Sequence, residues 1–228
     1  MKFLGSWLKS LLEVFFPFRC HACKKCCDFG VVLCDDCKRK LKGVISEPKL
    51  VSDTISDFDI YTMSSYDSFA ADMVKIIKYK PSKKLAKVLG KMCAEQGGLK
   101  SFLRPDDVLV PVPMHKKRLD ERGFNQAAVI AEQYAEAAGC HLSPAIVRSR
   151  FTKPQASCDE TERIHNLENA FALNPDIERS AFIGKRFILI DDVATTGTTL
   201  EKCSAPLKSL GASEIIALVV AHSYKHNS

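Results

Sequence analysis

The chain of 228 residues has few aromatic residues and no uninterrupted apolar run long enough to cross a bilayer. Aromatic side chains make up 8% of the composition and are scattered, so the sequence shows neither a stacking platform for nucleic acid nor an oligonucleotide-binding pattern. No internal repeat is visible, which excludes a solenoid. The net charge of +6 is modest and permits an anionic partner without requiring one. The composition is that of a globular protein with one α/β core and a small appendage.

Residues 1–18 look at first like a signal or an anchor. Lys9 and Glu13 interrupt the apolar run, which is too short to span a bilayer, and no small-residue cleavage site follows. The apolar residues have helical spacing, so we expect an amphipathic helix packed on the body, with weak membrane-surface association as the alternative. The sequence therefore predicts no stable membrane insertion and a cytoplasmic location.

Cysteine is concentrated, because six of the ten cysteines fall in CHACKKCCDFGVVLCDDC, residues 20–37. Two C-x2-C pairs separated by ten residues have the spacing of two knuckles that close a tetrahedral, structural zinc site. The predicted zinc ligands are Cys20, Cys23, Cys34 and Cys37. Cys26 or Cys27 could replace one of them, because Cys23-x2-Cys26 is also a knuckle spacing. A disulfide framework is the alternative, but nothing marks the chain as secreted.

The stretch FILIDDVATTGTTL, residues 187–200, joins an apolar run to a loop of small residues. The run 187–190 is typical of a parallel strand buried on both faces. The loop that follows predicts a helix start, where free amides and the helix dipole favour a phosphate. Its residues are Ala194, Thr195, Thr196, Gly197, Thr198 and Thr199. Asp191 and Asp192 would repel a phosphate unless they bind sugar hydroxyls or a cation attached to it; alternatively, they only cap the loop. The chemistry suggests a ribose 5-phosphate at the carboxyl end of a strand.

Strands and helices are expected to alternate, which indicates a doubly wound, mostly parallel sheet. We expect strands at 59–65, 108–113, 146–147, 186–191 and 214–221, and helices at 70–79, 84–96, 124–138 and 198–210. Residues 44–60 read as a linker and 150–166 as a long irregular loop. Pro206 lies inside the last helix, so either that helix kinks or its first half is mostly turn.

Lysine is dense between residues 71 and 91, where seven lysines stand against one acid, Asp72. They are Lys75, Lys78, Lys80, Lys83, Lys84, Lys87 and Lys91. The segment is either the solvated face of two helices or a surface that meets phosphates.

Several motifs, in this order, resemble a known family. FILIDDVATTGTTL is similar to the phosphoribosyl pyrophosphate (PRPP) motif of type I phosphoribosyltransferases. VPVPMHKKRLDERGFNQA (110–127), preceded by the four-cysteine module, narrows the likeness to the ComF family of competence-associated proteins. The likeness also covers FPFRCHAC, LCDDC, IIKYKPSKKLAKVLG and RSRFTKPQ. It implies a type I phosphoribosyltransferase fold over residues 55–228, with an amphipathic helix and a zinc-binding module in residues 1–45.

The resemblance also implies roles for individual residues. Asp191 and Asp192 would accept hydrogen bonds from the ribose hydroxyls of PRPP, and residues 194–199 would wrap its 5-phosphate. Residues 115–122 would be the pyrophosphate loop, and 150–166 a flexible hood. The loop residues expected to meet the pyrophosphate are His115, Lys116, Lys117, Arg118 and Arg122. Lys116 and Lys117 fit a solvated loop equally well. We expect Arg122, Asp191 and Asp192 to be catalytic, and Mg2+ to travel with the pyrophosphate.

Two functions follow from this likeness. The first is a PRPP-dependent phosphoribosyltransferase-type enzyme associated with DNA uptake, whose acceptor the sequence does not reveal. The second is a non-catalytic, PRPP-responsive adaptor of the competence machinery that binds single-stranded DNA or other competence proteins. Pyrophosphate release in the presence of PRPP and candidate acceptors would discriminate between them, because the same fold serves binding and catalysis.

Overall fold

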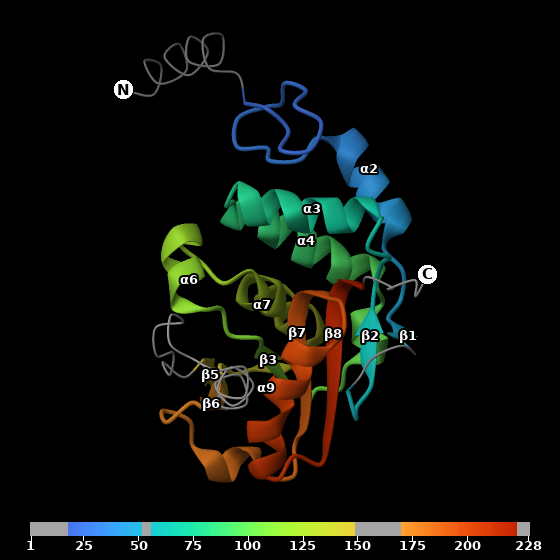
Figure 1. Cartoon of the computed structure of the whole chain (residues 1–228). Coiled ribbons are helices and arrows are strands. Elements are labelled where there is room, and N and C mark those ends of the chain that lie inside the picture. The colour runs from blue at the N-terminus through green and yellow to red at the C-terminus, as the bar shows by residue number, and fades with distance from the viewer. Residues whose placement is uncertain (1–17, 52–55, 149–169, 223–228) are drawn as a thin grey trace, which may run out of the picture.

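The computed structural model describes residues 18–51, 56–148 and 170–222. Apart from Phe18, the predicted N-terminal helix lies outside these ranges, and so does the predicted hood. The described part forms a six-stranded sheet in the order β1-β2-β8-β7-β3-β4, with helices on both faces (Figure 1). All neighbouring pairs in it are parallel except the edge pair β1–β2. The prediction of a mostly parallel α/β sheet is therefore confirmed.

The sheet strands come from distant parts of the chain. Their bounds are β1 Lys49–Val51, β2 Ile60–Thr62, β3 Val108–Pro111, β4 His141–Leu142, β7 Arg186–Ala194 and β8 Glu214–His222. The described helices are α2 Asp35–Val44, α3 Phe69–Tyr79, α4 Lys83–Gln96, α5 Leu99–Phe102, α6 Lys116–Arg122, α7 Gln126–Ala138 and α9 Thr198–Ser209, with a 3-10 turn at Arg179–Phe182.

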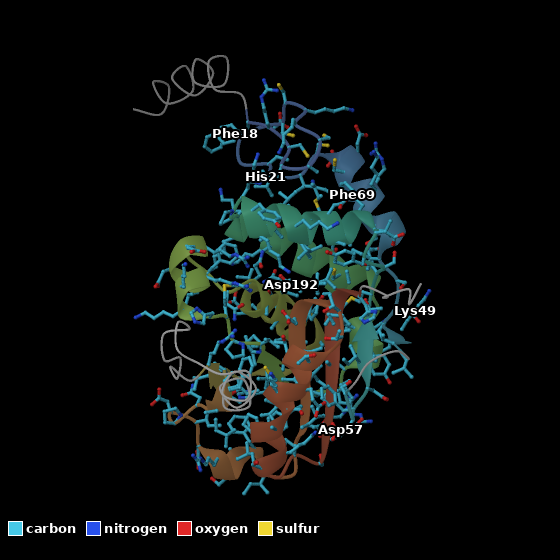
Figure 2. The ribbon with its side chains drawn as sticks, in the orientation of Figure 1. Phe18, His21, Lys49, Asp57, Phe69 and Asp192 are labelled. Atoms are coloured by element: carbon cyan, nitrogen blue, oxygen red, sulfur yellow. The ribbon has the colours of Figure 1, made fainter. Side chains whose placement is uncertain are left out.

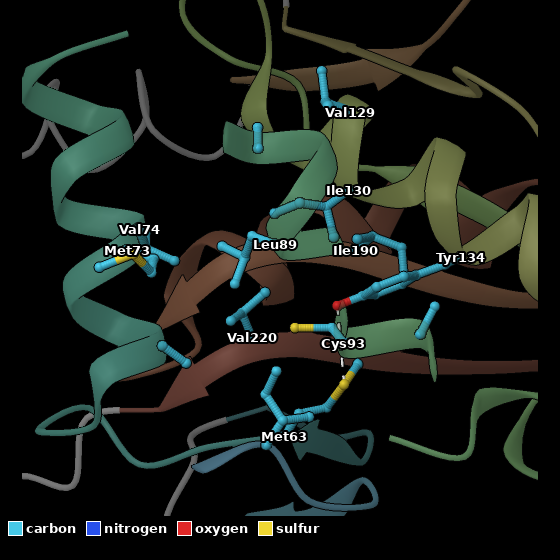
Figure 3. Packing of buried hydrophobic residues seen from close by; sticks show 14 of the residues in the cluster. Met63, Met73, Val74, Leu89, Cys93, Val129, Ile130, Tyr134, Ile190 and Val220 are labelled. Carbon is cyan, nitrogen blue, oxygen red and sulfur yellow. Dashed lines mark hydrogen bonds between the residues drawn. The ribbon is translucent and has the colours of Figure 1, made fainter. Parts of the chain in front are cut away.

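Strand β7 shows why its apolar run is unbroken. Successive residues alternate between two buried clusters: Ile188 and Ile190 face α3, α4 and α7, while Phe187 and Leu189 face α9. Side chains of a strand alternate between its faces, so a strand covered on both sides needs apolar residues throughout. Figure 3 shows the larger cluster, in which Ile190 and Val220 lie near Leu89 and Ile130.

The end of β7 differs from the prediction. The strand continues through both aspartates to Ala194, because β8 is equally long and pairs with it as far as Ala194 opposite His222. The helix that follows runs from Thr198 to Ser209 with Pro206 inside it. The alternative that its first half is mostly turn was therefore wrong.

Two further segments depart from the prediction. Part of the predicted linker forms β1, which pairs antiparallel with β2 at the edge of the sheet. The predicted pyrophosphate loop is mostly the helix α6, whose seven residues are all good helix formers except Asp120. His115 Nδ1 accepts a hydrogen bond from the Lys117 N–H at its start, and Gly123, with φ of 74°, ends it.

The cysteine-rich segment packs on α3 and α4 at one end of the molecule (Figure 1). Cys20, Leu33, Cys37 and Leu41 belong to the same buried cluster as Met73 and Ile77 of α3. Burial of apolar surface thus continues from the cysteine segment into the main core. A separate two-stranded antiparallel sheet, β5 Ile146–Arg148 with β6 Phe171–Leu173, lies beside α9.

Candidate functional site

Two adjoining cavities lie at the carboxyl end of β7. The smaller, about 70 Å³, is formed by the loop from β7 to α9 and is lined by Asp191, Val193, Ala194, Thr195, Thr196, Gly197, Thr198, Thr199 and Leu200. The larger, about 220 Å³, shares Asp191, Val193 and Thr199 with it and extends to α3, α6, α7 and β5. The shared residues make the two cavities parts of one site, at the sheet edge where parallel α/β proteins bind ligands.

The smaller cavity has the chemistry of a phosphate cup. Its six loop residues, 194–199, end at the start of the 12-residue helix α9, whose first N–H groups have no partner within the helix. Gly197 precedes that helix with φ of 81°, a conformation that other residues adopt at a cost. The hydroxyls of Thr196 and Thr198 are 2.8 Å apart, and none of the described residues that line this cavity has a cationic side chain. The cup would therefore hold an anion by amides, hydroxyls and the helix dipole.

Both aspartates line the larger cavity. Asp192 is 6% exposed, and its Oδ1 lies 3.0 Å from Lys78 Nζ. The backbone N–H of Asp192 donates to Asp191 Oδ1 over 2.8 Å. Burial and the neighbouring charge of Asp192 raise the pKa of Asp191 to about 7, against the opposing effects of that N–H and of Lys78. The pair can thus offer several carboxylate oxygens to hydroxyl groups of a ligand.

Cationic side chains from the predicted pyrophosphate segment reach the same cavity. His115, Arg118 and Arg122 line it, whereas Lys116 and Lys117 are exposed and do not. Arg122 donates to Gln126 Oε1 over 3.0 Å. Asn125 caps α7 and also donates through Nδ2 to the Val112 carbonyl over 2.9 Å, which ties the start of α7 to the end of β3. The structure brings together three of the five predicted residues, and the exposure of the two lysines fits their alternative as solvated residues.

Two cations of the site were not assigned to it from the sequence. Lys78 was grouped with the surface lysines of α3 and α4, yet it lines the larger cavity. Arg148, the last residue of β5, also lines it, with its guanidinium 5.4 Å from the centre of the Phe171 ring. Burial and the charge of Arg118 lower the pKa of Arg148. Helical periodicity could not have singled out Lys78, because its place depends on how α3 lies over β7.

The four predicted ligand cysteines come together in space. The sulfurs of Cys20, Cys23, Cys34 and Cys37 all lie within 4.8 Å of one another, and those of Cys23 and Cys34 are 3.6 Å apart. Tetrahedral zinc with four thiolates needs sulfurs about 3.8 Å apart, so the arrangement fits such an ion. Burial opposes ionisation of Cys20, but N–H groups of Cys34, Cys23 and Ala22 outweigh it and lower the pKa of the thiol to about 6.

The two remaining cysteines of the segment lie outside this group of four. Cys26 is exposed, and Cys27 Sγ lies 3.5 Å from the Lys25 carbonyl oxygen. Four thiolates in a closed set could bind a metal such as zinc and leave no coordination position for a substrate.

Lysines on α4 and near its start remain at the surface. Lys83, Lys84 and Lys87 are exposed and form no ion pair within the described ranges, whereas Lys91 lies 3.8 Å from Glu95. A neighbouring cavity of about 390 Å³ between the cysteine segment and the start of α4 is lined by Arg19, Cys20, His21, Lys24, Lys80 and Pro81. Figure 2 shows His21, within the cysteine segment, on the opposite side of α3 from Asp192.

Among the described residues, no helix combines the length and apolarity needed to cross a membrane.

Comparison with known proteins agrees with this site. A family model of the phosphoribosyl transferase domain matches residues 125–228, which include both aspartates and the cup. The chain is 34% identical over 114 residues to competence protein F of Haemophilus influenzae, covering 50% of this chain and 49% of that protein. It is 28% identical over 160 residues to the DNA utilization protein YhgH of Salmonella typhimurium, covering 68% of each. It is 40% identical over 96 residues to competence protein ComFC of Bacillus subtilis, covering 41% of this chain and 35% of that protein.

Among solved structures, similarity extends to a chain described as the allosteric regulatory enzyme of purine biosynthesis. The identity is 22%, the TM-score is 0.40, and the match covers 59% of this chain and 25% of that one. The match to competence protein F likewise spans about half of that protein's length. The transferase-domain match and the competence-protein relatives support a ComF-family protein with a phosphoribosyltransferase-type domain.

Proposed function

We propose that the chain binds PRPP at the end of β7 and is a phosphoribosyltransferase-type protein of DNA uptake. The observation that carries the proposal is the division of the site into a phosphate cup and a larger, cation-lined cavity, with Asp191 shared between them. The cup would take the 5-phosphate, and Asp191 and Asp192 would accept hydrogen bonds from the ribose hydroxyls. The larger cavity would take the pyrophosphate and the acceptor. The names of the relatives, competence protein and DNA utilization protein, support the association with DNA uptake.

The cations of the larger cavity suit the departure of pyrophosphate. When the bond between C1 and the pyrophosphate oxygen breaks, the electron pair leaves with the pyrophosphate and positive charge develops on the ribosyl ring. Arg118 and Arg122 line the cavity and would stabilise the leaving group by charge-assisted hydrogen bonds. Mg2+ would accompany the pyrophosphate, since it retains waters and binds phosphate oxygens readily. The ionised aspartate pair would also favour the developing positive charge.

The test is titration calorimetry with PRPP and Mg2+, using Asp192→Ala, Asp192→Asn and inorganic phosphate as comparisons. Each ribose hydrogen bond to a carboxylate contributes roughly 1.5–3 kcal/mol, so Asp192→Ala should weaken PRPP binding by about one to two orders of magnitude. Asp192→Asn keeps one acceptor oxygen and should lose less. Phosphate bound in the cup should keep its affinity in both variants. Parallel loss of both ligands with a lowered melting temperature would instead mean that the aspartates only cap the loop.

Enzyme activity is proposed separately from binding. Pyrophosphate should appear when the protein, PRPP and Mg2+ are mixed with the right acceptor from a panel of bases, nucleotides and single-stranded DNA. Without any acceptor-dependent release, the second candidate is favoured: a non-catalytic, PRPP-responsive adaptor that binds single-stranded DNA or other competence proteins. The exposed Lys83, Lys84 and Lys87 of α4 and the basic cavity beside the cysteine segment support this second candidate.

We further propose that the four cysteines bind a structural zinc ion. The sulfur separations suit Zn2+, and the lowered pKa of Cys20 favours its thiolate, whereas burial raises the pKa of Cys37, whose proton the metal would displace. Thiolates that hold a metal must stay reduced, which supports a cytoplasmic location. One bound zinc per chain in the purified protein is the expected measurement.

A further inference from the structure

Helix α3 places one lysine at the carboxylate pair. Lys78 lies at the last turn of α3, and its Nζ is 3.0 Å from Asp192 Oδ1. The Lys78 side chain is 33% exposed, while that of Asp192 is only 9% exposed. Within the described ranges, it is the only ion pair that involves Asp191 or Asp192. An ion pair with one buried partner is screened less by solvent than an exposed one.

Other charged or titratable groups also face the pair. From the elements around the cavity these are His115, Arg118, Arg122 and Arg148, with Cys203 of α9 behind Asp191 and His222 of β8 beside the loop. The arginines line the same cavity without an ion pair to either aspartate in the described part of the chain. They are therefore available to anionic groups of a ligand, and Lys78 is left as the counter-ion of the aspartates.

The position of Lys78 is fixed by the packing of α3. Met73, Val74 and Ile77 are buried in the cluster that also holds Cys37 and Leu41 of the cysteine segment. Ser68 caps the start of the helix by accepting from the Ala71 N–H over 3.3 Å. Because Ile77 is locked in the core, its neighbour Lys78 emerges at a defined place over the end of β7. The lysine is thus held at the cavity by the same helix that supports the cysteine segment.

We propose that Lys78 is a positioning residue of the ribose site. Its ammonium holds Asp192 in place and favours the ionised form of the neighbouring Asp191, so that the pair accepts hydrogen bonds from the hydroxyls of a phosphoribosyl ligand. The inference rests on the proposed function and adds to it a residue from outside the matched transferase-domain region.

The reason lies in the cost of two adjacent charges, of which one is buried and the other is half-buried. Burial and the charge of Asp192 raise the pKa of Asp191, and Lys78 acts in the opposite direction. A protonated carboxyl group loses acceptor capacity and becomes a donor, which matches ribose hydroxyls less well. Without Lys78, the pair would retain a proton to higher pH. Ribose binding at neutral pH would then weaken, although the phosphate cup would be intact.

The experiment measures ribose 5-phosphate affinity between about pH 5.5 and 8.5 for wild type, Lys78→Met and Lys78→Arg. Binding of wild type should tighten as pH rises through about 7, where Asp191 ionises. In Lys78→Met the midpoint should move to higher pH, and Lys78→Arg should restore it. The phosphate group of the ligand titrates identically in all three experiments. A difference between the midpoints therefore reflects ionisation of groups on the protein. Lys75→Met is the matched control, since Lys75 lies on the same helix, pairs with Asp72 and does not line the cavity.

Inorganic phosphate is the second probe, because it needs only the cup. Its affinity should be the same in wild type and Lys78→Met. An unshifted midpoint in Lys78→Met, or equal losses for phosphate and ribose 5-phosphate, would overturn the role of Lys78 while leaving ribose binding by wild type intact. If wild type bound phosphate but gained nothing from the ribose, the proposed function itself would fail, and this inference with it. Lys78→Gln provides the same comparison if the methionine variant does not fold.

Discussion

His222 Nε2 lies 2.8 Å from the carbonyl oxygen of Thr195, which links the end of β8 to the phosphate cup. His222 is 1% exposed and stands opposite Ala194 in the parallel pairing of β7 with β8. Since a carbonyl can only accept, Nε2 must carry the proton of this hydrogen bond. The neighbouring strand thus fixes the first turn of the loop whose amides face the cup.

Replacing His222 by Phe should weaken binding of inorganic phosphate by about tenfold. The variant removes a buried donor worth roughly 1 kcal/mol or more and leaves the Thr195 carbonyl unpaired, so the loop loses its fixed geometry. His222→Gln retains an N–H donor and should recover part of the affinity. Calorimetry with phosphate, alongside thermal unfolding, gives the measurement. A lower melting temperature with unchanged phosphate affinity would show that the bond serves only the fold.

Asp191→Asn should stabilise the free protein at pH 8 and abolish much of its PRPP binding. The folded pKa of Asp191, about 7, is raised above the ordinary value. The stability that goes with the neutral form is fully present below about pH 4 and is lost as pH rises to about 7. The asparagine never carries that charge, so its advantage should grow over this window to on the order of a few kcal/mol and then level off. Denaturant unfolding at several pH values tests this, and an advantage independent of pH would contradict it.

The predictable part of the site was local in the chain. A strand buried on both faces, two carboxylates and a small-residue loop follow one another within fourteen residues, 187–200, so one window of sequence contains the cup and the proposed ribose contacts. The grouping of the four cysteines was predictable for the same reason, because an x2 spacing lets two thiols converge on one point. In both cases covalent neighbours supply the geometry.

The unpredicted part depends on packing between distant segments. Lys78 and Arg148 reach the cavity because α3 and the β5–β6 pair are placed there by the core. The sequence around Lys78 shows only one more lysine in a lysine-rich helix. The extension of β7 to Ala194 was not predicted because it depends on pairing with the equally long β8. The sequence of one strand does not reveal how long its partner strand is.

Exposed lysines of α4 should contribute to binding of single-stranded DNA. Changing Lys83, Lys84 and Lys87 together to Glu should weaken binding and reduce the slope of log affinity against log salt by about 2, since each phosphate contact contributes about 0.7. Fluorescence anisotropy with a labelled oligonucleotide over a salt series measures both. The matched control is Lys49, Lys185 and Lys202 changed to Glu, which makes the same charge change away from α4. If both triple variants behaved alike, α4 would have no special part in DNA binding.

Removing the four-cysteine centre should loosen α3 and, through it, the ribose site. Cys37 is 2% exposed and packs in the same cluster as Met73 and Ile77, so Cys37→Ser should lose the metal and increase hydrogen exchange in α2 and α3. Ribose 5-phosphate should then bind about tenfold more weakly, because Lys78 no longer holds Asp192, whereas phosphate in the cup should bind as before. Cys26→Ser is the control, since Cys26 is exposed and lies outside the group of four. The Cys26→Ser variant should retain zinc, and loss of zinc from it would show that Cys26 is a ligand. A wild-type protein that folds normally without zinc would refute the metal centre.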